Sequence, residues 1–149
     1  LYDEKFSGGG VLMDLGCHLL HFGLALLPSR KNFSLKAVSQ NFLTSHHKVE
    51  DNAKIDGVVN DSVHFELDIS WASEMQTLSK VEIDVIGKNG KISNSDYQGK
   101  KSDGYSLMID DFLSNLRGEK KQDLSIVSDS LKMLFDSYLS IQNNEKIFY

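Results

Sequence analysis

The chain has 149 residues, of which 40% are hydrophobic and 25% charged, the composition of an ordinary globular protein with its own core. Its net charge of −5, with no block of Lys and Arg, argues against nucleic acid or an anionic membrane as the main partner. The longest strongly apolar run, Leu19 to Leu27, is too short to cross a bilayer. A single cysteine argues against an internal disulfide framework and is typical of a reducing, cytoplasmic setting.

The first expected element is a helix from about Val11 to Leu27. A loop at 7–10 with three glycines precedes it, and Pro28 ends it because proline has no N–H to continue the hydrogen-bond ladder. The chain starts without Met and leaves little room before this apolar segment, so we expect it to be a piece of a longer polypeptide.

Residues 33–95 are expected to be rich in strands. The segment SVHFELDISW alternates, so that Val63, Phe65, Leu67, Ile69 and Trp71 share one face while His64, Glu66, Asp68 and Ser70 share the other. The alternation returns in KVEIDVIGKNGKISN, which turns at Asn89-Gly90, and Asn60-Asp61 offers another turn. Short strands joined by tight turns predict a mainly antiparallel sheet with one covered face.

Two helices and a short strand are expected after the sheet. SLMIDDFLSNLRGE places Ile109, Phe112, Leu113 and Leu116 on one face and ends at Gly118. LSIVSDSLKMLFDSYLSIQNNEK ends near Asn143-Asn144 and carries, at helical spacing, Val127, Leu131, Leu134, Phe135, Tyr138 and Ile141. Both stripes are interpreted as core, and KIFY as a last strand at the sheet edge.

Four polar residues interrupt the apolar first helix, since at 100° per residue Asp14, His18 and His21 lie on one side with Cys17 beside them. Three interpretations are open. Asp14 and His18 form a structural pair; or Asp14, His18 and His21 bind a metal; or His18 performs acid–base chemistry with Asp14 one turn away. The metal interpretation has little support, because no further ligand cluster stands out in the sequence, and we predict no metal site.

The stretch SGGGVLMDLGCHLLHFGLALLP resembles the signature of the glucose–fructose oxidoreductase, inositol dehydrogenase and rhizopine-catabolism (Gfo/Idh/MocA) family. The residues that match its register are Gly8, Gly9, Gly10, Asp14, Gly16 and His18. Later segments resemble the same family in the same order, among them VEDNAKIDGVV, FELDISWAS, VEIDVIGKNGKIS and FLSNLRGEKK. The likeness therefore runs over nearly the whole chain.

The resemblance implies an α+β fold: an open, mainly antiparallel sheet with helices packed on one face, as in the family's C-terminal domain. Family members also have an N-terminal Rossmann domain that holds NAD or NADP. This sequence has no G-x-G-x-x-G after a strand and no Glu-Lys-Pro motif. We therefore expect residues 1–149 to be one C-terminal domain for substrate binding and oligomerisation, with the Rossmann domain as its partner elsewhere in the same polypeptide.

The family's chemistry implies the roles of individual residues. His18 is the expected acid/base for a secondary alcohol of a sugar or cyclitol, and Asp14 orients the substrate hydroxyl or the imidazole. Gly8, Gly9 and Gly10 are expected near substrate or cofactor, since they lack a Cβ. His21 stands where the family commonly has Asp, and it either lines the pocket or is a satisfied core histidine.

Two function classes follow from the sequence. The first is the substrate domain of an NAD(P)-dependent oxidoreductase, inactive as a fragment, which forms homo-oligomers through its sheet face. The second is a non-catalytic dimerisation or binding module in which Asp14 and His18 are a structural pair. Outward His64, Glu66, Asp68 and Ser70 make the expected sheet contact polar.

Overall fold

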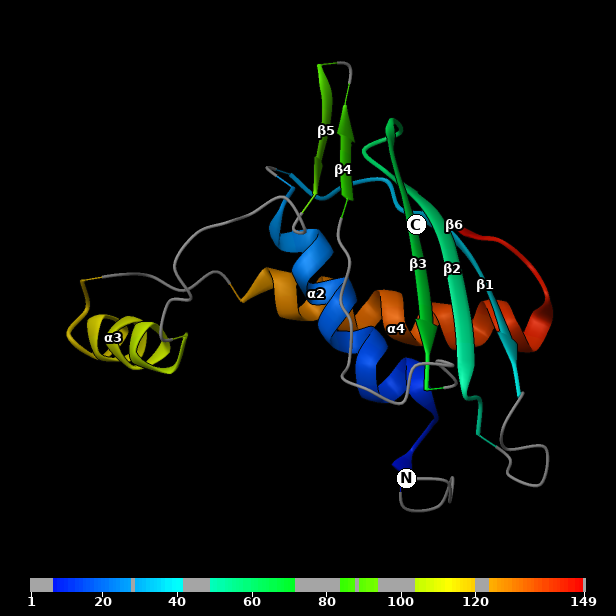
Figure 1. Cartoon of the computed structure of the whole chain (residues 1–149), viewed down its shortest axis with the longest axis horizontal. Coiled ribbons are helices and arrows are strands. Elements are labelled where there is room, and N and C mark those ends of the chain that lie inside the picture. Colours follow the sequence, from blue (N-terminus) through cyan, green and yellow to red (C-terminus); the bar gives the residue numbers. More distant parts are fainter. Residues whose placement is uncertain are drawn as a thin grey trace. The chain divides into compact units, whose positions relative to one another are not determined.

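The computed structural model describes residues 7–27, 29–41, 49–71, 84–87, 89–93, 104–119 and 124–148 (Figure 1). The chain divides into two compact units, one made of Leu1–Glu74 with Asp123–Tyr149 and the other of Met75–Gln122. The first helix, the main sheet and the last helix all belong to the first unit, which therefore carries the candidate site.

The first helix starts as a π-helix, η1 (Leu12–Gly16), and continues directly as α2 (Cys17–Ala25). The expected helix is confirmed in position, but α-helical spacing does not predict its wide first turn. Such π turns recur at functional sites in helices. Pro28, the expected stop, lies outside the described residues.

Four strands form the main sheet in the order β3-β2-β1-β6, with every neighbouring pair antiparallel. They are β1 (Ser34–Gln40), β2 (Asn52–Val59), β3 (Val63–Ser70) and β6 (Ile147–Phe148). The turn at Asn60-Asp61 and the terminal edge strand are both confirmed. The alternation in β3 is confirmed at Ile69, which is buried, and at its exposed neighbour Asp68, whereas Val63 at the strand's start is exposed.

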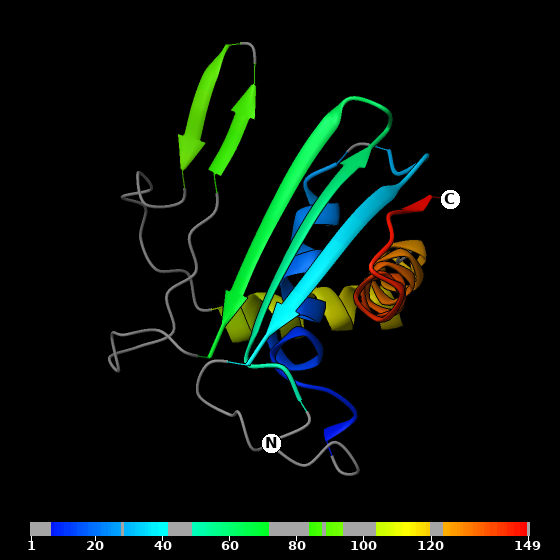
Figure 2. The same ribbon diagram turned by 90° about the vertical axis from the view of Figure 1, so that its right-hand side faces the viewer.

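One face of the sheet is covered by α2 and by α4 (Ser125–Asn143), as Figure 2 shows. The core between these layers is built from inward strand residues and from the helices, including Leu35, Ile55, Ile69, Leu12, Leu20 and Leu134. The expected fold class, an open antiparallel sheet with helices on one face, is thus confirmed.

The helix α4 packs on the sheet through a different face from the one its apolar stripe predicts. Leu134 is buried and Tyr138 half-buried, but Leu131 and Phe135 are 45% and 57% exposed. Three serines take their place in the core: Ser130, Ser137 and Ser140. A serine adds little bulk and satisfies its own hydroxyl locally, so that the helix lies close against the strands.

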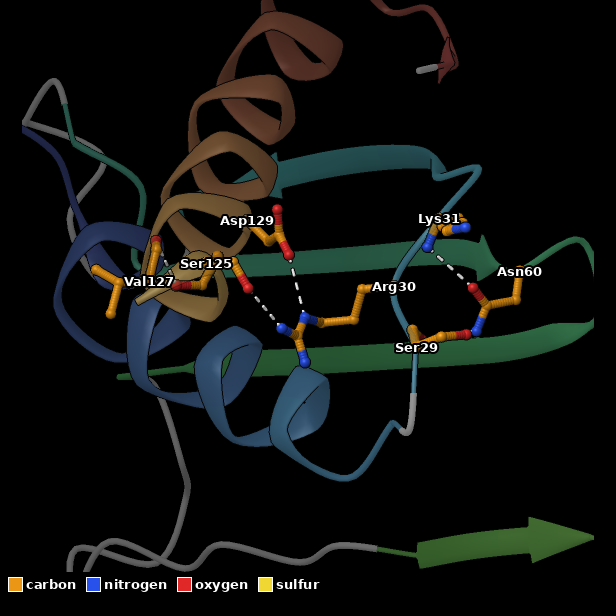
Figure 3. Close-up of polar contacts among 8 residues, drawn as sticks. Ser29, Arg30, Lys31, Asn60, Ser125, Val127 and Asp129 are labelled. Carbon is orange, nitrogen blue, oxygen red and sulfur yellow. Dashed lines mark hydrogen bonds and ion pairs between the residues drawn. The ribbon is translucent and has the colours of Figure 1, made fainter. Parts of the chain in front are cut away.

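A network of polar contacts holds the segment after α2 (Figure 3). Arg30 Nε lies 3.1 Å from Asp129 Oδ2, and its Nη2 donates to Ser125 Oγ at 2.8 Å. Next to it, the Lys31 N–H donates to Asn60 Oδ1 at 2.9 Å, while Asn60 Nδ2 donates to the Ser29 carbonyl at 2.8 Å. The segment is therefore joined both to the start of α4 and to the turn between β2 and β3.

The second unit contains a hairpin, β4 (Asp84–Gly87) with β5 (Gly90–Ser93), and the helix α3 (Gly104–Leu116). The hairpin and the Gly118 cap are as predicted, with Gly118 at φ 73°. The stripe of α3, predicted to be core, is not buried within its own unit, where Ile109, Phe112 and Leu116 are all more than half exposed. Among the described residues, no helix is long and apolar enough to cross a membrane.

Candidate active site

The glycine run before the first helix forms a turn against the segment that leads into β2. The N–H of Gly10 donates to both carboxylate oxygens of Glu50, at 3.1 and 3.2 Å, and the N–H of Leu12 donates to Oε1 at 3.1 Å. Between them, the Val11 N–H donates to the Glu50 carbonyl at 2.9 Å. One residue therefore accepts from three consecutive N–H groups at the start of the helix, where backbone donors otherwise lack partners.

Two of the three glycines are needed for contacts inside the protein. Gly9 and Gly10 are buried, and a Cβ on Gly10 would collide with the Glu50 carbonyl while one on Gly9 would collide with the Tyr138 hydroxyl. Gly8 differs, because it is exposed, has φ +72° and has open space where a Cβ would lie. Of the three, Gly8 is the position whose backbone is open to an approaching ligand.

Asp14 lies at the centre of the π turn, and its side chain is exposed. Its Oδ2 accepts a hydrogen bond of 3.1 Å from the indole N–H of Trp71, the residue that follows β3. Trp71 is anchored in turn, because its backbone N–H donates to the carbonyl of the buried Asp51 at 2.9 Å. The Asp14 carboxylate is therefore held by the sheet, from outside its own helix.

His18 and His21 lie on α2, and both are exposed. The His18 imidazole makes no hydrogen bond to another described residue, and none joins it to Asp14. The interpretation of His21 as a core histidine is wrong, since the residue faces outward. Within the described residues, no three His, Cys, Asp or Glu side chains gather as metal ligands would; His46 and His47 lie outside them.

Tyr138 links the turn to α4. Its hydroxyl donates to Glu50 Oε1 at 3.0 Å. Burial, together with the negative charge of Glu50, holds the pKa of Tyr138 well above its ordinary value, so the hydroxyl keeps its proton. The glycine turn, the start of β2 and the last helix thus meet at a single carboxylate.

Three residues of this arrangement are not predicted from the sequence: Glu50, Trp71 and Tyr138. Glu50 and Trp71 stand at strand ends, and Tyr138 belongs to a stripe interpreted as core. A carboxylate just before a strand and a tryptophan just after one are weak signals, because their partners are distant in the sequence. Only the glycine run, which needs an acceptor for its N–H groups, points towards them.

Solved structures with the same fold include several dehydrogenases. The chain superimposes on GenD2 from gentamicin A biosynthesis, solved with NAD, with a TM-score of 0.80 and 18% identity, over 99% of this chain and 50% of that one. The WlbA dehydrogenase from Bordetella pertussis, solved with NADH and UDP-GlcNAcA, gives a TM-score of 0.73 and 20% identity, over 93% and 45%. A myo-inositol dehydrogenase from Corynebacterium glutamicum gives 0.76 and 12%, over 96% and 50%.

The chain spans about half the length of these solved structures. No curated protein matches it. A family model described as GFO/IDH/MocA C-terminal domain matches residues 1–93, which is more than half of the 149 residues. The chain therefore belongs to the GFO/IDH/MocA C-terminal domain family.

Proposed function

We propose that this chain is the substrate-binding domain of an NAD(P)-dependent oxidoreductase that acts on a secondary alcohol of a sugar or cyclitol. The single observation that carries the proposal is that the His18 imidazole and the Asp14 carboxylate are both exposed on the family's glycine-preceded helix, four residues apart. The similar folds solved with nicotinamide cofactors support the class of reaction.

His18 acts as the general acid/base. Its imidazole takes the hydroxyl proton as the alcohol is oxidised and returns it in the reverse direction. Because no described residue engages this imidazole, it is available to a substrate. Asp14, whose Oδ2 accepts from Trp71, uses its remaining acceptor capacity to orient the substrate hydroxyl beside His18.

The chemistry that a bound nicotinamide supplies is hydride transfer. This chain contributes accessible groups around that step: the open backbone at Gly8 lies near substrate or cofactor, and the exposed His21 lines the substrate pocket. Gly9 and Gly10 are buried against Tyr138 and Glu50, and these contacts fix the turn that carries Gly8. The nucleotide itself is held mainly by a Rossmann domain of the same polypeptide, since this sequence has no G-x-G-x-x-G.

The outer face of the main sheet is the proposed contact between copies of the protein. It carries charges of both signs, with Lys36 opposite Asp56, Lys54 opposite Asp68 and the like charges Asp56 and Glu66 opposite each other in register. Lys54 also pairs with Glu66 at 3.0 Å. Because a twofold contact places the same patch of both copies face to face, lysines of one copy can meet carboxylates of the other. Light scattering of the full-length protein at low and high salt tests it, and a monomer at both overturns it.

The test of the enzymatic proposal uses the full-length protein, NAD⁺ and NADP⁺, and a panel of sugars and cyclitols, with nicotinamide absorbance as the readout. We expect His18→Ala to lower kcat by about 100-fold to 10,000-fold while dinucleotide binding persists. Added imidazole then restores part of the turnover in His18→Ala. Full turnover in His18→Ala contradicts the role of His18, and a full-length protein that binds no dinucleotide favours the non-catalytic module instead.

A further inference from the structure

We propose that Glu50 is a positioning residue, which fixes the direction in which Asp14 and His18 face by holding the turn where their helix begins. The inference rests on the proposed function and adds a residue to its machinery. Glu50 lies outside the helix, 36 residues after Asp14, and none of the expected roles includes it.

The contacts of Glu50 hold the start of the helix at three consecutive N–H groups. Its side chain accepts from the N–H groups of Gly10 and Leu12, and its carbonyl accepts from that of Val11. A rotation of the helix by one residue turns each side chain by about 100°. Such a rotation would break all three hydrogen bonds together, so Glu50 selects one orientation of the π turn.

The orientation of the helix start fixes that of Asp14 and His18, because both residues lie on the same continuous helix. Asp14 lies within η1, and His18 follows on α2 without a break in the helix. The next residue after Glu50, Asp51, accepts the backbone N–H of Trp71, whose indole holds Asp14. The Glu50–Asp51 segment therefore positions both partners of the Trp71–Asp14 contact: Glu50 holds the helix that carries Asp14, and Asp51 holds Trp71.

The carboxylate is itself fixed from a third side. Glu50 Oε1 accepts from Gly10, from Leu12 and from the Tyr138 hydroxyl, at 3.1, 3.1 and 3.0 Å. Its position is thus determined by two helices and a strand end, which is the kind of support that holds a catalytic constellation to the accuracy it needs.

Two conservative variants of the full-length protein separate position from charge. Glu50→Gln keeps a carbonyl oxygen where Oε1 lies, but it loses the charge and the weaker second acceptor, Oε2, of the Gly10 N–H. Glu50→Asp keeps the charge but withdraws the carboxylate by about 1.5 Å, one carbon–carbon bond. Glu145→Asp is the matched control, because Glu145 is exposed beyond the end of α4. The readouts are kcat, the KM for polyol and nicotinamide, and amide hydrogen exchange at Gly10 and Leu12.

If Glu50 is a positioning residue, the kcat of Glu50→Gln stays within about threefold of that of the unmodified protein. The kcat of Glu50→Asp falls by about 100-fold, with little change in the KM for nicotinamide. Exchange at Gly10 and Leu12 accelerates in Glu50→Asp and not in Glu145→Asp. The reverse ranking, with Glu50→Asp active and Glu50→Gln inactive, overturns the proposal, as does unchanged exchange in Glu50→Asp. If the unmodified protein oxidises no polyol, the proposed function fails, and the exchange result alone decides whether Glu50 fixes the turn.

Discussion

The indole N–H of Trp71 donates to the Asp14 carboxylate across 3.1 Å, and so connects the end of β3 to the π turn of the first helix. Replacing this donor tests whether the contact matters for turnover. We expect Trp71→Phe to lower kcat by about tenfold, because the ring remains but the carboxylate loses the group that aims it. Steady-state kinetics on the full-length protein measure the effect.

A double-mutant cycle gives the control for Trp71. In an Asp14→Ala background the indole N–H has no side-chain acceptor at position 14, so Trp71→Phe should cost much less there than in the unmodified protein. Equal losses in both backgrounds would show that Trp71 acts through packing alone, since its ring also lies against the core.

The glycine turn makes a sharp prediction about stability. Gly10→Ala should destabilise the fold by about 1–3 kcal/mol, because the new Cβ collides with the Glu50 main chain, which a side-chain rotation does not relieve. Gly23→Ala is the matched control, since Gly23 lies in α2 with nothing near its Cβ position, and there alanine should stabilise by about 0.5–1 kcal/mol. Urea unfolding measures both, and equal effects would contradict the prediction.

Tyr138 should make stability depend on alkaline pH. Its pKa is raised in the folded state, so its contribution is complete below the ordinary tyrosine pKa of about 10 and is lost as the pH rises beyond it. Tyr138→Phe should cost about 1–2 kcal/mol near neutrality, where the hydrogen bond to Glu50 is intact. The difference should shrink between about pH 10 and pH 11 in urea unfolding. A constant difference would refute this.

Two buried serines of α4 should behave differently. Ser140 Oγ accepts from the Ala37 N–H of β1 at 2.9 Å, so Ser140→Ala leaves a buried donor unpaired and should cost about 1–3 kcal/mol. Ser137 Oγ only donates to the Met133 carbonyl of its own helix, so Ser137→Ala should cost less than about 1 kcal/mol. Thermal unfolding of the two variants gives the comparison, and equal costs would contradict it.

The fold follows from the sequence wherever a pattern is local. The alternation in β3, the turn at Asn60-Asp61 and the stop at Gly118 each depend on neighbouring residues, and the structure contains all three. The packing face of α4 does not follow, because buried Ser130 and Ser137 are judged polar by any hydropathy pattern. Their burial depends on how closely the helix packs on the sheet, and the sequence of the helix alone does not specify that distance.

The candidate site shows the same division. The glycine run and the spacing of Asp14 and His18 identify the helix that carries it. The π turn that carries Asp14 begins where Gly10 and Leu12 donate to Glu50, 40 residues beyond Gly10 in the chain. Helical spacing at 100° per residue predicts neither this π turn nor a contact so distant in the sequence.

The Glu50 contacts also have a consequence for ligands with phosphate groups. A glycine-rich run that leads into a helix is ordinarily a place where an anion binds, because free N–H groups and the helix dipole both favour negative charge. Here a carboxylate of the protein already neutralises that end of the first helix. A phosphate group would therefore need a counter-charge other than this helix start.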